Sequence, residues 1–170
     1  MSTLQAKTIV RCPLSQAPVY LDRFFAERSG EDLGRLTLTL RAPLDMLGSR
    51  TDMALEREVA VTIERRHDER AGGGPLQVAW HPLGGGPFPA FRGTLTIEAD
   101  EDYTSSRLAL DGEYTPPLGV PGAAFDAALG HRIAQATARD LLSRIGTTIE
   151  SAYQGAEEVK AASRRTAEAT

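Results

Sequence analysis

The sequence has 170 residues, of which 41% are hydrophobic and 25% charged, so it can bury one core of ordinary size but hardly two. Its formal net charge of -4 lacks the basic excess typical of nucleic-acid-binding proteins, and we expect no nucleic-acid partner. The single cysteine, Cys12, excludes an internal disulfide, and no apolar run approaches the ~20 residues that span a bilayer; we expect a cytoplasmic protein without membrane insertion.

The first two thirds of the chain alternate between predicted strands and one short helix. Residues 7–12 are rich in β-branched side chains and predict a strand that ends at Pro13. Apolar residues then recur at three- and four-residue spacing between Val19 and Phe25, which predicts a short amphipathic helix. Alternation of apolar and polar residues predicts five further strands, at 35–41, 55–64, 76–81, 91–99 and 103–114.

A proline- and glycine-rich stretch at 116–122 ends this pattern, and a helix is predicted over 123–153. Its apolar side includes Leu129, Ile133, Leu141 and Ile145, opposite a polar stripe. Residues 155–170 contain almost no large apolar side chain, so we expect a disordered C-terminal tail after a single domain of residues 1–154.

This order of elements, with the segment Leu-Ala-Leu-Asp-Gly-Glu-Tyr-Thr-Pro-Pro at 108–117, resembles the START-like or SRPBCC superfamily of polyketide cyclase/dehydrase and lipid-transport proteins. The resemblance covers residues 6–153. It implies an α+β helix-grip fold, in which a curved antiparallel sheet grips a long C-terminal helix and one or two short helices follow the first strand. It also implies a small hydrophobic ligand, either a lipid or an aromatic, polyketide-like metabolite, between the helix and the sheet.

Small residues on the predicted helix and strands decide whether such a cavity has room. Ala134 and Ala138 on the helix, with Gly93 and Gly112 on the strands, fit a pocket, but the same residues also fit close packing of helix on sheet. The predicted ligand-binding residues are Arg57, Val59, Val61, Val78, Trp80, Phe91, Leu95, Leu108, Leu110, Tyr114, Ala134 and Ala138.

Three polar side chains are candidates for contacts with a ligand. Arg57 interrupts an apolar strand face and could anchor a ligand carboxylate or phenolate, or else reach solvent at the strand end. Tyr114 could present its hydroxyl to a ligand or serve as a core ring. His81 alternates with Trp80 and is expected to face outward.

No motif assigns a catalytic residue, a metal site or a cofactor. The three histidines lie in different elements without a cysteine or histidine at ligand spacing. We therefore favour a binder of a small hydrophobic molecule. Two alternatives stay open: an aromatic cyclase or dehydratase using Arg57, Tyr114 or His81 in the same cavity, and a module that binds a protein partner or forms a homodimer.

Overall fold

The computed structural model describes residues 2–29, 34–43, 54–65, 74–84, 88–115 and 127–168. The elements are, in chain order, β1 (Ser2–Val10), α1 (Ala17–Ala26), β2 (Arg35–Pro43), β3 (Ala54–Arg65), β4 (Leu76–Pro82), β5 (Ala90–Ala99), β6 (Ser106–Thr115) and α2 (Ala127–Glu168). None of the helices in these ranges has the length of apolar sequence that crossing a membrane requires.

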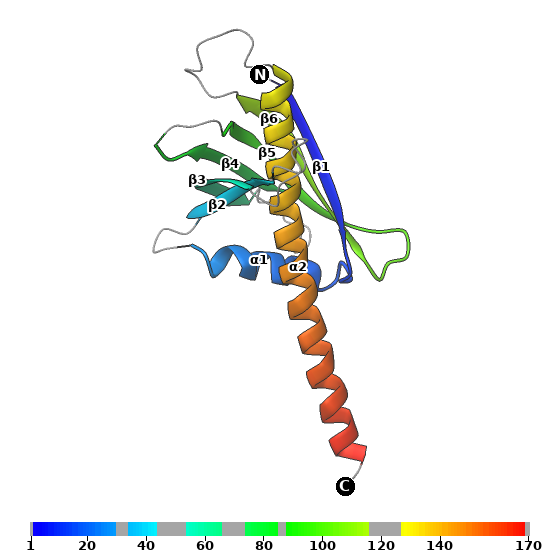
Figure 1. Ribbon diagram of the computed structural model, residues 1–170. Helices are drawn as coiled ribbons and strands as arrows, with labels where there is room; N and C mark the ends of the chain where they lie inside the picture. The colour runs from blue at the N-terminus through cyan, green and yellow to red at the C-terminus, as the bar shows by residue number, and fades with distance from the viewer. Residues whose placement is uncertain are drawn as a thin grey trace.

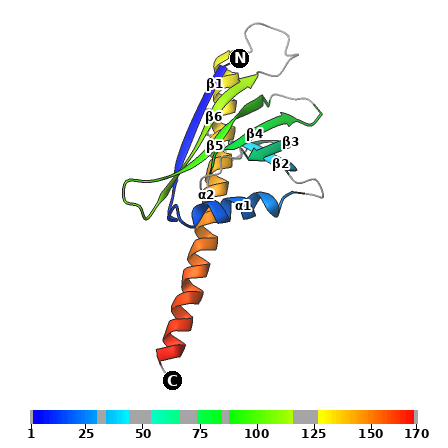
Figure 2. The ribbon, with the colours of Figure 1, turned by 180° about the vertical axis from the view of Figure 1, so that it is seen from behind.

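The six strands form one antiparallel sheet in the order β1-β6-β5-β4-β3-β2. The sheet curls into a half-barrel, and α2 runs along its concave side, in contact with the two edge strands β1 and β2 and with β6 (Figure 1). Helix α1 crosses α2 at the lower end of the sheet, as the view from behind also shows (Figure 2). The predicted helix-grip architecture is confirmed.

The strands follow the predicted alternation, with apolar residues on the concave face and polar residues on the convex one. In β4, for example, Leu76, Val78 and Trp80 are buried, whereas His81 is exposed. The first strand is longer than predicted, because the ladder with β6 runs from the pair Ser2 and Tyr114 to the pair Val10 and Ser106. The polar start of the chain is therefore an edge strand whose Leu4 and Ala6 reach the core.

The C-terminal prediction was wrong: residues 155–168 do not form a disordered tail but continue α2 to Glu168. This end of the helix projects beyond the sheet and α1 (Figure 1). The predicted loop at 116–122 and the predicted helix start at 123 lie outside the described residues.

Candidate ligand-binding site between the long helix and the sheet

The concave face of the sheet is an apolar surface that faces α2. Eleven of the twelve predicted ligand-binding residues are buried: Val59, Val61, Val78, Trp80, Phe91, Leu95, Leu108, Leu110 and Tyr114 on the strands, and Ala134 and Ala138 on α2. The twelfth, Arg57, is half-buried.

One row of side chains crosses the middle of this face. Val61, Trp80, Phe91 and Tyr114 are direct neighbours on β3, β4, β5 and β6. The rings of Trp80 and Phe91 are stacked, with centroids 4.2 Å apart and planes inclined by 22°. The indole Nε1 of Trp80 donates a hydrogen bond to the Pro89 carbonyl at 3.2 Å, so this buried ring is fixed at its polar end as well.

Gly93 and Gly112 do not leave open space beside this row. They pair directly in the ladder, and a β-carbon on either would lie within 2.8 Å of Cζ of Phe91. The Phe91 ring therefore occupies the room that the two glycines make, and Trp80 stacks on that ring. On this part of the concave face the small residues serve close packing.

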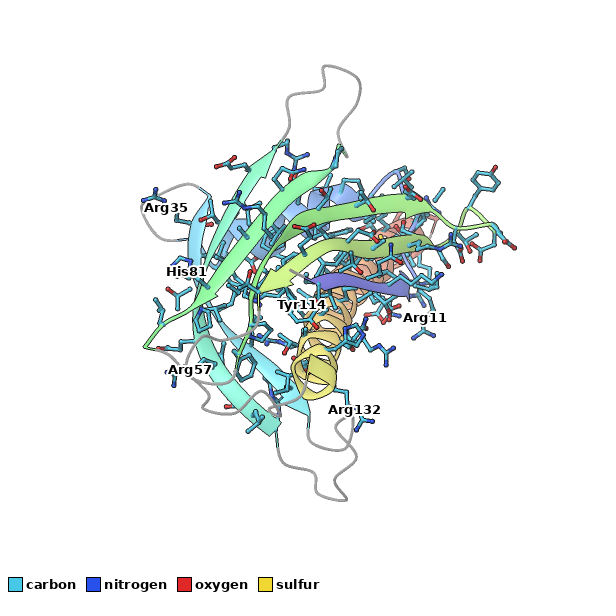
Figure 3. The ribbon with its side chains drawn as sticks, turned by 90° about the horizontal axis from the view of Figure 1, so that it is seen from above. Arg11, Arg35, Arg57, His81, Tyr114 and Arg132 are labelled. Carbon is cyan, nitrogen blue, oxygen red and sulfur yellow. The ribbon has the colours of Figure 1, made fainter. Side chains whose placement is uncertain are left out.

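Tyr114 ends the aromatic row and points to the start of α2 (Figure 3). The Tyr114 side chain is buried, and its hydroxyl lies 3.4 Å from Nδ1 of His131, which is an exposed residue. A phenol and an imidazole at this distance can form a long hydrogen bond in which either is the donor, and either can instead donate a hydrogen bond to a ligand oxygen.

The sequence analysis did not single out His131. A signal was present, because His131, Ala134 and Ala138 follow each other at spacings of three and four and so share one face of the helix. That face meets the sheet, which brings the imidazole to Tyr114.

A second polar group lies further along the buried side of α2. Thr137 is fully buried, and its hydroxyl has no hydrogen-bond partner among the described residues. It shares a helix face with Ala134 and Leu141, both of which are also buried. It lies six positions after His131, which corresponds to ~9 Å along the helix axis.

Arg57 lies apart from these groups. Its guanidinium donates a hydrogen bond to the Gly84 carbonyl in the turn after β4, and its Nε is buried without a partner among the described residues. In Figure 3, Tyr114 lies beside the start of α2, whereas Arg57 and His81 lie at the opposite wall of the sheet. His81 is exposed, as predicted. The enzyme hypothesis needs at least two of Arg57, Tyr114 and His81 to converge in the cavity, and the structure places the three apart from one another.

The arrangement contains no metal centre in the described ranges, where no three His, Cys, Asp or Glu side chains are grouped to hold an ion. No protein-family model and no curated protein matches the sequence. The arrangement is, however, known among solved structures. The protein TTHA0849 of Thermus thermophilus superimposes with a TM-score of 0.55 over 89% of this chain and 99% of its own, at 13% identity.

The chain has the helix-grip fold. Two more solved structures match over most of their length with lower TM-scores. A START superfamily protein of Mycobacterium smegmatis has a TM-score of 0.47 and 12% identity, over 90% of this chain and 97% of its own. The Zhui aromatase/cyclase of Streptomyces sp. R1128 has a TM-score of 0.46 and 11% identity, over 92% and 93%. At these sequence identities, the solved structures are similar to this chain in fold alone.

Proposed function

We propose that the protein binds a small, largely apolar molecule between α2 and the concave face of the sheet. The observation that carries this proposal is the Thr137 hydroxyl, which is fully buried and unpartnered, among the described residues, on an otherwise apolar helix face. A buried hydroxyl without a hydrogen bond costs roughly 1–3 kcal/mol. A ligand that bonds to it recovers that free energy.

The chemistry of the surrounding residues defines the ligand class. The concave face contributes aromatic and aliphatic area, which supports affinity through burial of apolar surface at about 25 cal/mol per Å². Hydrogen bonding is centred on two places, Thr137 and the pair Tyr114 and His131. An apolar molecule with one or two hydroxyl or carbonyl groups fits this pattern, as in a lipid or an aromatic metabolite.

The test uses Trp80, the single tryptophan, whose ring lies in the middle of the concave face. Naphthalene and 2-naphthol are titrated into the protein while Trp80 emission is recorded, because the two probes differ only by one hydroxyl. Both are expected to change the emission. Thr137→Val is expected to weaken 2-naphthol about fivefold and to leave naphthalene unchanged, since only one hydrogen bond is lost.

Thr96→Val is the matched control, because Thr96 lies on the convex face of β5 and its loss is expected to change neither affinity. Native mass spectrometry before and after solvent extraction identifies any molecule that copurifies. The proposal is contradicted if neither probe changes Trp80 emission and the purified protein has the mass of the chain alone.

A further inference from the structure

A polar groove lies between the two helices, away from the concave face of the sheet. It is a hollow of ≈ 470 Å³, and its lining residues are Phe24, Arg28, Ser143, Arg144, Thr147, Thr148 and Ser151. Two are arginines and four carry hydroxyl groups, while none of these described lining residues has a carboxylate. The groove is thus locally cationic in a chain whose net charge is -4.

Arg28, just after the end of α1, is held on the wall of this groove. It donates a hydrogen bond from Nη1 to the Phe24 carbonyl at 2.8 Å, and its Cζ lies 3.9 Å from the centre of the Phe24 ring. Phe24 is almost fully buried, so the guanidinium rests on a fixed support. One N–H is used in this way, and the remaining donors of the fork stay available.

Arg144 on α2 is fixed in a similar way. Its Nη1 donates to the Thr39 carbonyl of β2 at 2.7 Å and lies 3.7 Å from the Asp140 carboxylate, one turn earlier on the helix. Asp140 offsets part of this charge, although burial raises the pKa of its carboxyl above the ordinary value. Arg28 has no carboxylate partner among the described residues, so within the described part of the chain Asp140 offsets only part of the charge of the two arginines.

The hydroxyl groups form a ladder along one side of α2. Ser143, Thr147 and Ser151 follow each other at intervals of four residues, which places them above one another on the helix surface. None of the three hydroxyls is hydrogen-bonded to another described residue. Thr148 differs, because its hydroxyl donates to the Arg144 carbonyl.

We propose that this groove binds a phosphate group carried by a small molecule or a lipid headgroup. Two guanidinium forks and three hydroxyls without a described partner supply more donors than the two oxygens of a carboxylate can accept, whereas a phosphate has three terminal oxygens for them. Both arginines are held in place before a ligand arrives, which reduces the entropy lost on binding. The volume of the groove leaves room for an organic group next to the phosphate. The site is separate from the proposed apolar one and does not depend on it.

The first experiment is a titration with inorganic phosphate followed by NMR of backbone amides and arginine Nε–H groups, with chloride replacing phosphate at equal ionic strength as the reference. The expected shifts cluster at Arg28, Arg144 and Thr147. Arg28→Gln and Arg144→Gln are each expected to weaken binding tenfold or more, because each removes charged hydrogen bonds to the anion. Arg144→Lys keeps the positive charge but loses the planar set of N–H donors of the guanidinium. The affinity of this variant for phosphate is expected to lie between that of Arg144→Gln and that of the unsubstituted protein.

Arg164→Gln is the control, since Arg164 is an exposed arginine on the projecting end of the same helix. If Arg144→Gln does not fold, because the Thr39 carbonyl loses its donor, Arg28→Gln and Ser151→Ala carry the test. The second arm measures binding to phosphatidylcholine vesicles with and without phosphatidic acid. Arginine-dependent binding of phosphate assigns a soluble ligand, and arginine-dependent binding to phosphatidic acid alone assigns a headgroup. The proposal is overturned if phosphate causes the same chemical shifts as chloride and the protein does not bind the vesicles. It is also overturned if Arg164→Gln weakens binding as much as Arg28→Gln and Arg144→Gln do.

Discussion

Gly93 on β5 and Gly112 on β6 face each other directly in the ladder, and neither leaves space for a β-carbon. At Gly93 the added carbon would lie 2.3 Å from the Asp111 carbonyl oxygen and 2.5 Å from Cζ of Phe91. Backbone cannot yield there, and the Phe91 ring is held by its stack with Trp80. We therefore expect Gly93→Ala to lower the free energy of unfolding by at least about 2 kcal/mol, as measured by denaturant unfolding.

Gly155→Ala is the matched control, because that glycine lies on an exposed helical turn with nothing within 4 Å of the added carbon. Here the same substitution is expected to be neutral or to stabilise by up to about 1 kcal/mol. Near-ultraviolet circular dichroism of Trp80 should change in Gly93→Ala and not in Gly155→Ala. Equal stabilities of the two variants would show that the glycine pair does not set the position of the aromatic row.

The sequence predicts the burial of a residue better than it predicts the contacts of that residue with other elements. Alternation within one strand was enough to predict that Val59, Leu108 and Leu110 are buried, because burial of a strand residue depends on its face. The sequence assigned no role to His131 or Thr137. His131 contacts Tyr114 from β6, and the Thr137 hydroxyl has no hydrogen-bond partner among the described residues. Helical spacing places His131 on the face with Ala134 and Ala138, but local periodicity does not show which residue of another element that face meets.

At the scale of elements, α2 is fastened to both open edges of the sheet. On the β1 side, Glu150 accepts a hydrogen bond from the Arg11 backbone N–H at 2.7 Å, and the Arg11 guanidinium lies 3.4 Å from the same carboxylate. On the β2 side, Arg144 donates to the Thr39 carbonyl. Both contacts satisfy backbone groups at or beside an edge strand, where the sheet itself supplies no partner.

The reactivity of the Cys12 thiol tests the contact between Arg11 and Glu150. The thiol is fully buried, and burial together with the charge of Glu150 raises its pKa to about 11 from the ordinary value of 9.0. At pH 8 Cys12 is therefore expected to react slowly with Ellman's reagent, since roughly 100-fold less thiolate is present than in an unfolded chain. Glu150→Ala is expected to speed the reaction, because it releases the Arg11 N–H and removes the negative charge.

The same pKa fixes the direction of a pH dependence. Between pH 9 and 11 the native thiol keeps its proton while the unfolded thiol loses it, so this group makes the free energy of unfolding fall as the pH rises through that window. Glu157→Ala serves as the control, because Glu157 pairs with Lys160 on the projecting part of α2, away from Cys12. A labelling rate that is the same in Glu150→Ala and in the unsubstituted protein would contradict this role for Glu150.

The order of the elements was predictable and the pairing of the strands was not. Six strands, one short helix and one long helix could be assigned in sequence because each carries its own periodicity. The pairing of β1 with β6 joins segments about a hundred residues apart, and the periodicity of neither segment indicates it. The same pairing extends β1 back to Ser2, through residues too polar to indicate a strand alone.

For the whole molecule, the main error concerned the end of the chain. The lack of large apolar residues at 155–170 predicts disorder, but a helix needs an apolar face only to pack against other elements, and it can extend without one. The costly step of nucleation is already made in the part of α2 that packs on the sheet. Beyond it, Ala, Glu, Lys and Arg are among the residues that extend a helix with the least loss of free energy.

This explanation predicts that the projecting end of α2 is helical without contributing to the stability of the domain. Its side chains from 158 to 167 are exposed, Glu157 is half-buried, and Val159 has 68% of its surface accessible. A chain that ends at Gln154 keeps Tyr153, which packs against the core, and is expected to unfold within about 0.5 kcal/mol of the full chain. Circular dichroism should show the loss of helix, and amide exchange in the full chain should be fast after residue 155 and slow between Ile133 and Ile149. A large drop in the unfolding midpoint on truncation would mean instead that this end of the helix is held by a partner, and a midpoint that depends on protein concentration would identify that partner as a second copy of the chain.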